Sequence, residues 1–255
     1  MAESAQLRRD IFNEFAELYD EVRPGYAETV IDDIASFAGL QRAARILEVG
    51  CGTGQITIPF ARRGYHIFAL EPGSAMCEIA RRKCRSFPNV VISQVSFEDW
   101  SVEYGSFDLF LAAQAFHWIE PVYGCAKVAE LLRPGGVVAL VWHEDMSQNT
   151  PFYKETQAIY DEYLPAERTT LAPPVYEEAL GRSGTFTEIH YVVHDWDKTY
   201  SKSDYVKLLN TFSDHRLLPE PFRTHFFAAI EHTIDRNGGS VTRKTQTQGL
   251  LARRA

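Results

Sequence analysis

The sequence predicts an α/β fold built on an open, doubly wound sheet, and three observations lead to this prediction. An apolar run at 45–49 stops in alternating glycines and is followed by a helical stretch at 55–63. A second buried strand, at 65–70, ends in an acidic residue. Further apolar strands at 107–113 and 137–142 are separated by a helix that closes in a Pro-Gly-Gly turn. Buried strands that alternate with helices are typical of a mostly parallel sheet with helices on both faces.

The first strand runs directly into Gly50-Cys51-Gly52-Thr53-Gly54. Glycine adopts positive φ and carries no Cβ, so this loop lets a ligand approach the backbone closely. Free N–H groups at the start of the next helix would add polar anchoring. A dinucleotide fingerprint needs a further glycine where Gln55 or Thr57 stands, and a phosphate-binding P-loop needs a lysine after the last glycine. Neither pattern is complete here.

What remains is Glu48-x-Gly-x-Gly-x-Gly, which resembles the first motif of the class I S-adenosylmethionine methyltransferases. The resemblance implies that the loop wraps the methionine end of S-adenosylmethionine, a cofactor without a pyrophosphate. It also implies cofactor contacts at the motif's own residues, Glu48, Gly50, Cys51, Gly52 and Gly54.

An acidic residue at the carboxyl end of the second strand, roughly 20 positions after the glycines, can accept hydrogen bonds from both ribose hydroxyls. Glu71 occupies this position, which suits NAD as well as S-adenosylmethionine. A charge near the start of the next helix is the structural alternative. Pro72 follows directly, and Met76 is expected to pack against adenine or in the core.

The third strand, beginning at Val90, leads into Ser96, Phe97, Glu98 and Asp99. Adenine needs an apolar slot and one acceptor for its exocyclic amine, and these residues offer both at one strand end. The family resemblance implies an acidic residue beside the base at this point. The spacing leaves open whether Glu98 or Asp99 meets it.

The strand at 107–113 is followed by Gln-Ala-Phe-His-Trp, which is similar to the small-molecule branch that includes trans-aconitate methyltransferase-like proteins. The fourth strand of a doubly wound sheet borders the ligand crevice. We therefore expect Gln114 and Ala115 to face the methionine half, and His117 and Trp118 to face the acceptor or adenine side. His117 is the candidate catalytic residue, and a structural histidine is the alternative.

Residues 8–22 place apolar and aromatic side chains at helical spacing, and Arg23-Pro24 ends this helix before another at 27–37. An aromatic stripe is usually core or a docking face. The pattern also resembles the N-terminal lid of small-molecule methyltransferases, which implies that Tyr19 and Arg23 close over the cofactor. Phe12 is then a candidate substrate contact.

The second half of the sequence has the spacing of three further helices. One covers 150–164, one begins after Ser201 or Ser203 as its N-cap, and one covers 221–235. This half also predicts a loop around Pro173-Pro174, a sixth strand at 189–196 and a last strand at 241–254. In the family, such helices cover the substrate. His143 and Tyr205 are accordingly substrate candidates, and Arg23 or Arg216 could hold a substrate carboxylate.

Composition narrows the class of protein. The 255 residues carry a formal net charge of −8, which argues against a nucleic-acid partner. No apolar stretch approaches the roughly 20 residues that span a bilayer, and residues 1–9 lack a signal-peptide apolar region. The four cysteines have no zinc or Cys-x-x-Cys spacing. We expect a cytoplasmic protein with reduced cysteines, Cys77 and Cys84 packed in the core, and no metal.

Together the landmarks imply a Rossmann-like class I methyltransferase: a seven-stranded, mostly parallel sheet with its last strand antiparallel. We expect one domain with an N-terminal lid (1–40), a cofactor core (41–143), an acceptor cap with the sixth strand (144–236) and the last strand (237–255). The implied reaction is in-line methyl transfer to a small molecule, with a carboxylate or a hydroxyl as the candidate acceptor group, releasing S-adenosylhomocysteine. The acceptor, the need for a base and the choice of monomer or homodimer stay open. A non-catalytic S-adenosylmethionine-binding regulator and a NAD-linked oxidoreductase are the alternatives.

Overall fold

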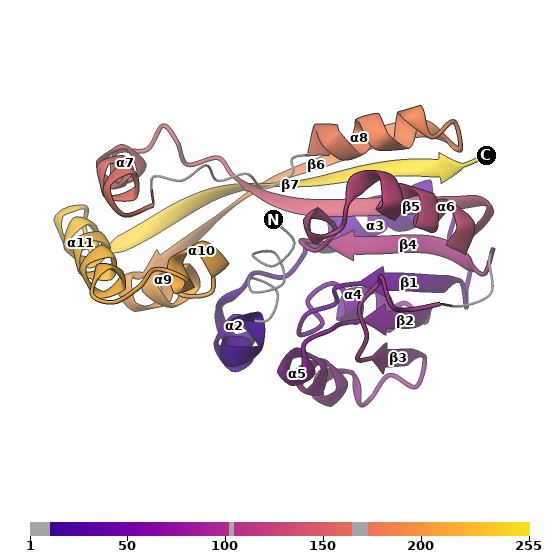
Figure 1. Ribbon diagram of the computed structural model, residues 1–255, viewed down its shortest axis with the longest axis horizontal. Helices are drawn as coiled ribbons and strands as arrows, with labels where there is room; N and C mark the ends of the chain where they lie inside the picture. Colours follow the sequence, from indigo (N-terminus) through magenta and orange to yellow (C-terminus); the bar gives the residue numbers. More distant parts are fainter. Residues whose placement is uncertain (1–10, 102–104, 165–172) are drawn as a thin grey trace. The chain divides into compact units, whose positions relative to one another are not determined.

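The computed structural model describes residues 11–101, 105–164 and 173–255 (Figure 1). They form a seven-stranded sheet in the order β3-β2-β1-β4-β5-β7-β6. The strands are β1 (Arg45–Val49), β2 (His66–Leu70), β3 (Val90–Ser93), β4 (Phe107–Ala113), β5 (Leu132–Asp145), β6 (Phe186–Ser201) and β7 (Ser240–Arg254). The pairs from β3 to β5 are parallel, and β7 runs antiparallel to its neighbours (Figure 1). The predicted fold class is confirmed.

Helices connect the strands, as the alternating pattern predicted. Before the second strand they are the 3₁₀ turn η1 (Phe12–Phe15), α2 (Ala16–Val22), α3 (Glu28–Phe37) and α4 (Thr57–Arg62). The middle of the chain adds α5 (Ser74–Cys84), the 3₁₀ turn η2 (Phe116–Trp118) and α6 (Pro121–Leu131). The remainder are α7 (Pro151–Tyr163), α8 (Pro173–Arg182), α9 (Lys202–Leu209), α10 (Ser213–Arg216) and α11 (Phe222–Arg236).

The chain divides into two compact units. Unit 1 consists of Met1–Arg23, Glu144–Arg168 and Asp195–Gln246. Unit 2 consists of Pro24–His143, Thr169–His194 and Thr247–Ala255. The chain crosses from one unit to the other within β5, β6 and β7. The division into lid, core and cap remains a prediction.

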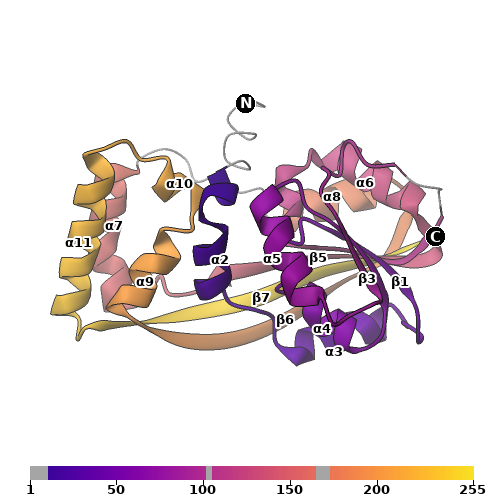
Figure 2. The ribbon, with the colours of Figure 1, turned by 90° about the horizontal axis from the view of Figure 1, so that it is seen from below.

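Both faces of the sheet in unit 2 are buried. Alternating residues of one strand serve the two faces, so Leu47 packs with the residues of α6 and α8, while Ile46 packs with those of α3 and α4. Figure 2 shows α6 and α8 on one side of the sheet and α3 and α4 on the other. This explains why the strands read as continuous apolar runs: a parallel sheet covered on both faces has no polar side.

Unit 1 has its own core. Phe226, Ile230 and Ile234 of α11 are buried against Leu209 of α9 and partly buried aromatic residues of α7. The helical spacing read at 150–164 and 221–235 is thus the spacing of a shared apolar face.

Two predictions for the loops were wrong. Pro173-Pro174 begins α8 instead of forming a loop, because proline in the first helical turn lacks only an N–H that would have no partner there. The Pro-Gly-Gly segment is not a turn before β5 but lies within it, at a register irregularity against β4. A positive φ of 76° at Gly135 accommodates that irregularity.

Other boundaries differ modestly. In the described part of the chain, the helix predicted at 8–22 begins with η1. Residues 8–10 of that helix and the polar segment 1–9 lie outside the described residues. The helix predicted from Gln55 begins at Thr57, and Ser201, not Ser203, caps α9. All four cysteines are free and buried, so Cys77 and Cys84 are core residues as expected.

Candidate active site

The switch point of the sheet lies between β1 and β4, because the chain proceeds from β1 to β2 on one side and returns to β4 on the other. Ligands of doubly wound sheets bind beyond the carboxyl ends of such strands. Here the two exits touch: a Cβ added to Gly50 would lie 2.4 Å from the Cβ of Ala115. Gly50 also has a φ of 68°. Only glycine satisfies both conditions, so the sequence motif has a direct steric cause.

The glycine loop, Gly50–Gly54, is joined to the end of β2. The amides of Gly50 and Cys51 both donate to the carbonyl of Leu70, at 2.8 and 3.1 Å. The amide of Gly54 donates to the carbonyl of Cys51 at 2.9 Å. The expectation of free N–H groups at the start of the next helix concerns other residues and stays a prediction. The amides of Gly50, Cys51 and Gly54 donate within the protein, which leaves the loop poorly suited to a pyrophosphate.

Glu71 completes this connection. One carboxylate oxygen accepts from the amide of Gly52 at 3.0 Å, and the other from the amide of Gly73 at 2.9 Å. A carboxylate oxygen accepts more than one hydrogen bond, so these two bonds are compatible with the predicted contact to ribose hydroxyls. The side chain thus positions a negative charge at the glycine loop, where it repels a phosphate group.

Glu48 lies beneath the loop and is only 1% exposed. The Thr57 hydroxyl donates to one of its oxygens at 2.9 Å, and the other oxygen has no hydrogen-bond partner among the described residues. Burial raises the pKa of Glu48 to about 8, while the Thr57 hydrogen bond opposes that shift. At neutral pH this carboxyl is mostly protonated, so it joins β1 to α4 as an uncharged group.

The exit of β4 is held in an unusual conformation. Gln114 has a φ of 54°, which is rare for a residue other than glycine. Its amide donates to Val141 at 2.8 Å, and its side chain donates to the carbonyl of His143 at 3.3 Å. His143 in turn contacts the Thr247 hydroxyl at 2.9 Å and stacks on Tyr26 with centroids 4.5 Å apart. Such strain at a strand exit commonly marks a functional site.

The loop after β3 closes on itself. The Ser96 hydroxyl donates to the Asp99 carboxylate at 2.7 Å and accepts from the Asp99 amide at 3.1 Å. Phe97 is buried against Phe110, whereas Glu98 and Asp99 are exposed. Asp99 thus serves as an acceptor within its own loop, and the choice between Glu98 and Asp99 as the acceptor for a base stays a prediction.

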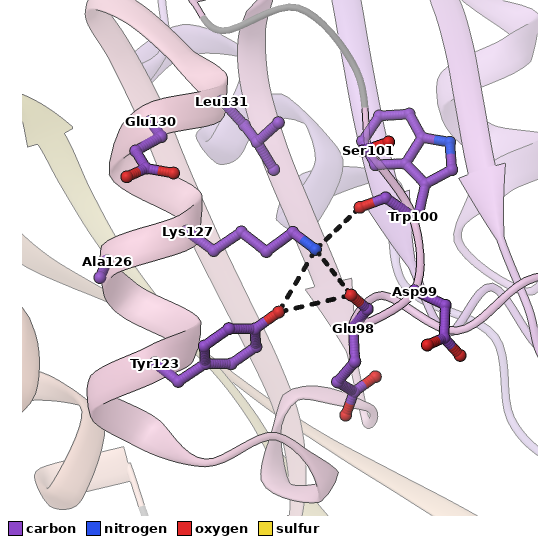
Figure 3. Close-up of a pocket in the computed structure, with 9 residues that line it drawn as sticks. All are labelled: Glu98, Asp99, Trp100, Ser101, Tyr123, Ala126, Lys127, Glu130 and Leu131. Carbon is purple, nitrogen blue, oxygen red and sulfur yellow. Dashed lines mark hydrogen bonds between the residues drawn. The ribbon is translucent and has the colours of Figure 1, made fainter.

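Figure 3 shows Glu98 and Asp99 among the residues that line a cavity of about 370 Å³ between this loop and α6. After the exit of the neighbouring strand β2, Pro72 is exposed and Met76 is buried. His117 lies in η2 with its ring 4.8 Å from that of Trp118. These placements are compatible with the predicted roles and do not test them.

The lid candidates lie in unit 1. The guanidinium of Arg23 donates to the Thr211 hydroxyl at 2.8 Å and to the Thr211 carbonyl at 2.7 Å. It also lies over the rings of Tyr19 and Phe212. Phe12 meets Tyr19 edge to face. The predicted closure of Tyr19 and Arg23 over a cofactor remains a prediction.

Tyr205, also in unit 1, packs edge to face against Phe152 and Tyr200. Burial raises its pKa well above the ordinary value for a phenol. Near it in the chain, Arg216 lies over the Phe15 ring, and its Nε is buried with no hydrogen-bond partner among the described residues. Of the two predicted carboxylate-binding arginines, Arg216 therefore has the more available donor.

Thr57 and Tyr26 were missed by the sequence reasoning. Thr57 is the first residue of α4 and partners the motif's glutamate; its position nine residues after Glu48 was the only available signal. Tyr26 follows the Arg-Pro break and has no signal for its stacking on His143. Across residues 11–101, 105–164 and 173–255, no group of three metal-ligating side chains gathers. Nor does any helix in those ranges have the length and apolarity to cross a bilayer.

Comparison with known proteins relates this chain to methyltransferases. Residues 46–136 match the family described as methyltransferase domain. An uncharacterized methyltransferase of Mycobacterium tuberculosis is 34% identical over 139 residues, 53% of this chain and 54% of that protein. The match thus spans about half the length of that relative. An uncharacterized methyltransferase-like protein of Schizosaccharomyces pombe is 26% identical over 84% of this chain and 81% of its own length.

The fold is likewise found among solved structures. A putative type II methyltransferase from Anaeromyxobacter dehalogenans superposes with a TM-score of 0.60 at 21% identity, covering 91% of this chain and 97% of that one. At this identity the similarity establishes the shared fold.

Proposed function

We propose that the chain is an S-adenosylmethionine-dependent methyltransferase acting on a small molecule, because residues 46–136 match the methyltransferase-domain family and the fold is shared with a putative methyltransferase. A lone pair of the acceptor attacks the sulfonium methyl carbon, the carbon–sulfur bond breaks with its electrons passing to sulfur, and S-adenosylhomocysteine leaves. The positive sulfur already activates the methyl group, so the protein mainly aligns the reactants.

One observation carries the proposal: amides of the glycine loop donate hydrogen bonds to acceptors within the protein, and one of these acceptors is the Glu71 carboxylate. Gly52 donates to Glu71, and its neighbours donate to Leu70. A dinucleotide would need those amides for its pyrophosphate. A cofactor that carries a cationic sulfur and an ammonium group, with no phosphate, suits such a loop. This favours S-adenosylmethionine over NAD.

In this proposal, each group of residues contacts a different part of the cofactor. Glu71 binds the ribose hydroxyls, with Pro72 and Met76 beside the nucleoside, and Ser96, Phe97 and Glu98 form the adenine site. Gln114 and Ala115 face the methionine half with the glycine loop and Glu48, and Trp118 borders the adenine or acceptor side. Tyr19 and Arg23 belong to the lid, and His117 stays the candidate for direct chemistry.

The acceptor is a small carboxylate or hydroxyl compound, and Arg216 favours the carboxylate. Its buried Nε supports an anion there. A carboxylate acceptor is ionised at neutral pH and needs no general base. This agrees with the raised pKa of Tyr205, whose phenol stays protonated. Phe12, His143 and Tyr205 are the further substrate candidates.

Calorimetry with S-adenosylmethionine and S-adenosylhomocysteine tests the cofactor, with NADH as the matched control. Transfer of a radiolabelled methyl group to a panel of small carboxylates and alcohols tests the reaction. Heat of binding followed by transfer supports the proposal. Binding without transfer to any compound would favour the non-catalytic regulator, and no heat with either ligand on folded protein would remove both.

A further inference from the structure

Lys127 lies in α6, where Glu130 is the other charged residue, and its ammonium group contacts the loop after β3. Its Nζ donates to the carbonyls of Phe97 at 2.6 Å, Trp100 at 2.8 Å and Glu98 at 3.2 Å. Figure 3 shows the side chain reaching across the cavity to this loop. An ammonium group has three donors, and these three carbonyls lie closer to Nζ than its fourth hydrogen-bond partner, the Tyr123 hydroxyl.

The same ammonium group also contacts the aromatic ring of Phe97 in this loop. Nζ lies 4.8 Å from the centroid of Phe97, whose side chain is only 3% exposed and packs against Phe110. The Tyr123 hydroxyl, one turn earlier on α6, is 3.4 Å from Nζ. Backbone and ring of the predicted adenine slot are thus held from one point by hydrogen bonds and a cation–π contact.

These bonds decide which acceptors the loop offers to a ligand. The carbonyls of Phe97, Glu98 and Trp100 face Lys127, and the carbonyl of Ser96 accepts from the Trp100 amide at 3.1 Å. Figure 3 shows the carboxylates of Glu98 and Asp99 pointing away from the ammonium. The loop therefore turns its main-chain acceptors inward and presents carboxylates outward.

Building on the function proposed above, we propose that Lys127 is a positioning residue that sets the base specificity of cofactor binding. By holding three carbonyls on the inner side of the loop, it leaves a carboxylate as the acceptor that meets the base. An exocyclic amine at position 6, as in adenine, donates to that acceptor. A carbonyl at position 6, as in hypoxanthine, is itself an acceptor and is repelled. Lys127 touches neither the cofactor nor the reacting atoms.

The test compares S-adenosylhomocysteine with S-inosylhomocysteine, which differ in the group at position 6, by calorimetry on the full chain. In Lys127→Met we expect S-adenosylhomocysteine to bind about tenfold more weakly or worse, the scale of one lost charge-assisted hydrogen bond at the base. S-inosylhomocysteine should change by less than about threefold, so the ratio of the two affinities falls. Lys127→Arg, which keeps charge and donors, should restore part of that ratio.

Lys154→Met is the matched control, because Lys154 is an exposed lysine on the helix α7 and the same substitution there should leave both affinities unchanged. Equal weakening of both ligands in Lys127→Met would mean general damage to the loop and would overturn the proposal, as would an unchanged ratio. If that variant melts below the assay temperature, Lys127→Gln is judged by the same ratio. A wild-type protein that binds neither ligand indicates failure of the proposed function instead.

Discussion

The glycine-loop edge of unit 2 and the aromatic core of unit 1 are built in different ways. At the loop, backbone amides donate to fixed acceptors, Leu70 and Glu71, over distances of 2.8 to 3.1 Å. In unit 1, rings and polar side chains hold one another. His215 contacts the Leu209 carbonyl at 2.9 Å and stacks on Phe226 with centroids 5.0 Å apart.

The two regions therefore constrain their amino-acid sequences in different ways. A site made from backbone requires particular conformations, and glycine is nearly the only residue that supplies them. A site made from side chains accepts many combinations of similar volume. A shared cofactor suits the first kind of site and a protein-specific acceptor the second. The following predictions test this contrast, beginning with the largest effect.

Glu71→Ala should weaken binding of S-adenosylhomocysteine by about 100-fold or more. The variant loses the hydrogen bonds to ribose, each worth about 1.5–3 kcal/mol when one partner is charged. It also releases the amides of Gly52 and Gly73. Titration calorimetry measures the loss, and Glu78→Ala on the exposed side of α5 is the control. A change below about threefold would remove Glu71 from the cofactor site.

Gly50→Ala should reduce the free energy of unfolding by about 3 kcal/mol. The positive φ costs alanine about 1 kcal/mol, and the collision of the added Cβ with Ala115 costs about 2 kcal/mol more. Gly39→Ala isolates the first cost, since Gly39 has a φ of 60° and open space around it. Urea denaturation measures both variants. Equal losses would show that the two strand exits do not press on each other.

Glu48→Gln should alter how stability depends on pH. The folded protein holds a proton on Glu48 up to a pKa of about 8, whereas the unfolded chain releases it near 4.5. The stabilising contribution of the neutral carboxyl is therefore complete below pH 4.5. It declines as pH rises toward 8, by at most about 1.4 kcal/mol per pH unit.

Glutamine keeps the acceptor for Thr57 and cannot ionise, so its variant lacks that decline. Denaturation curves at pH 5, 6, 7 and 8 should show the variant gaining on the wild type as pH rises. Parallel curves would mean that Glu48 is already ionised in the folded protein.

In unit 1, Arg216→Gln should raise the KM for a carboxylate acceptor by about tenfold, the scale of one charge-assisted hydrogen bond, with kcat little changed. Arg223→Gln is the control, because Arg223 is already paired with Glu220 at 2.7 Å. Steady-state kinetics with the acceptor found in the methyl-transfer panel provides the measurement. An equal effect of both substitutions would assign the change to overall charge.

The smallest effect is expected for Tyr205→Phe. Burial raises the pKa of Tyr205, so its phenol is protonated throughout the neutral range and is not a base. We expect kcat to fall by less than about threefold, against the ~100-fold or more that a lost general base costs. Rates from pH 6 to 9 check this. A large loss confined to one side of the profile would restore a role in proton transfer.

The sequence alone determined the sheet of unit 2, and the residues of its site stay predictions. Leu47 and its neighbours read as a buried strand because both faces of the sheet are covered, and Gly50 is required by a positive φ and by the nearness of Ala115. Such local demands are visible in residue types. The role of the proline pair at 173–174 was misread, since a helix start and a loop accept the same residues.

Only the tertiary structure decided which groups satisfy one another. Lys127 meets a loop about 30 residues away, Glu71 takes the amide of Gly52, and Thr57 donates to Glu48. Nothing in the spacing of these residues reveals the pairing, because hydrogen bonds between elements depend on how the elements pack. The raised pKa of Glu48 has the same origin: burial, which belongs to the folded protein and not to the residue.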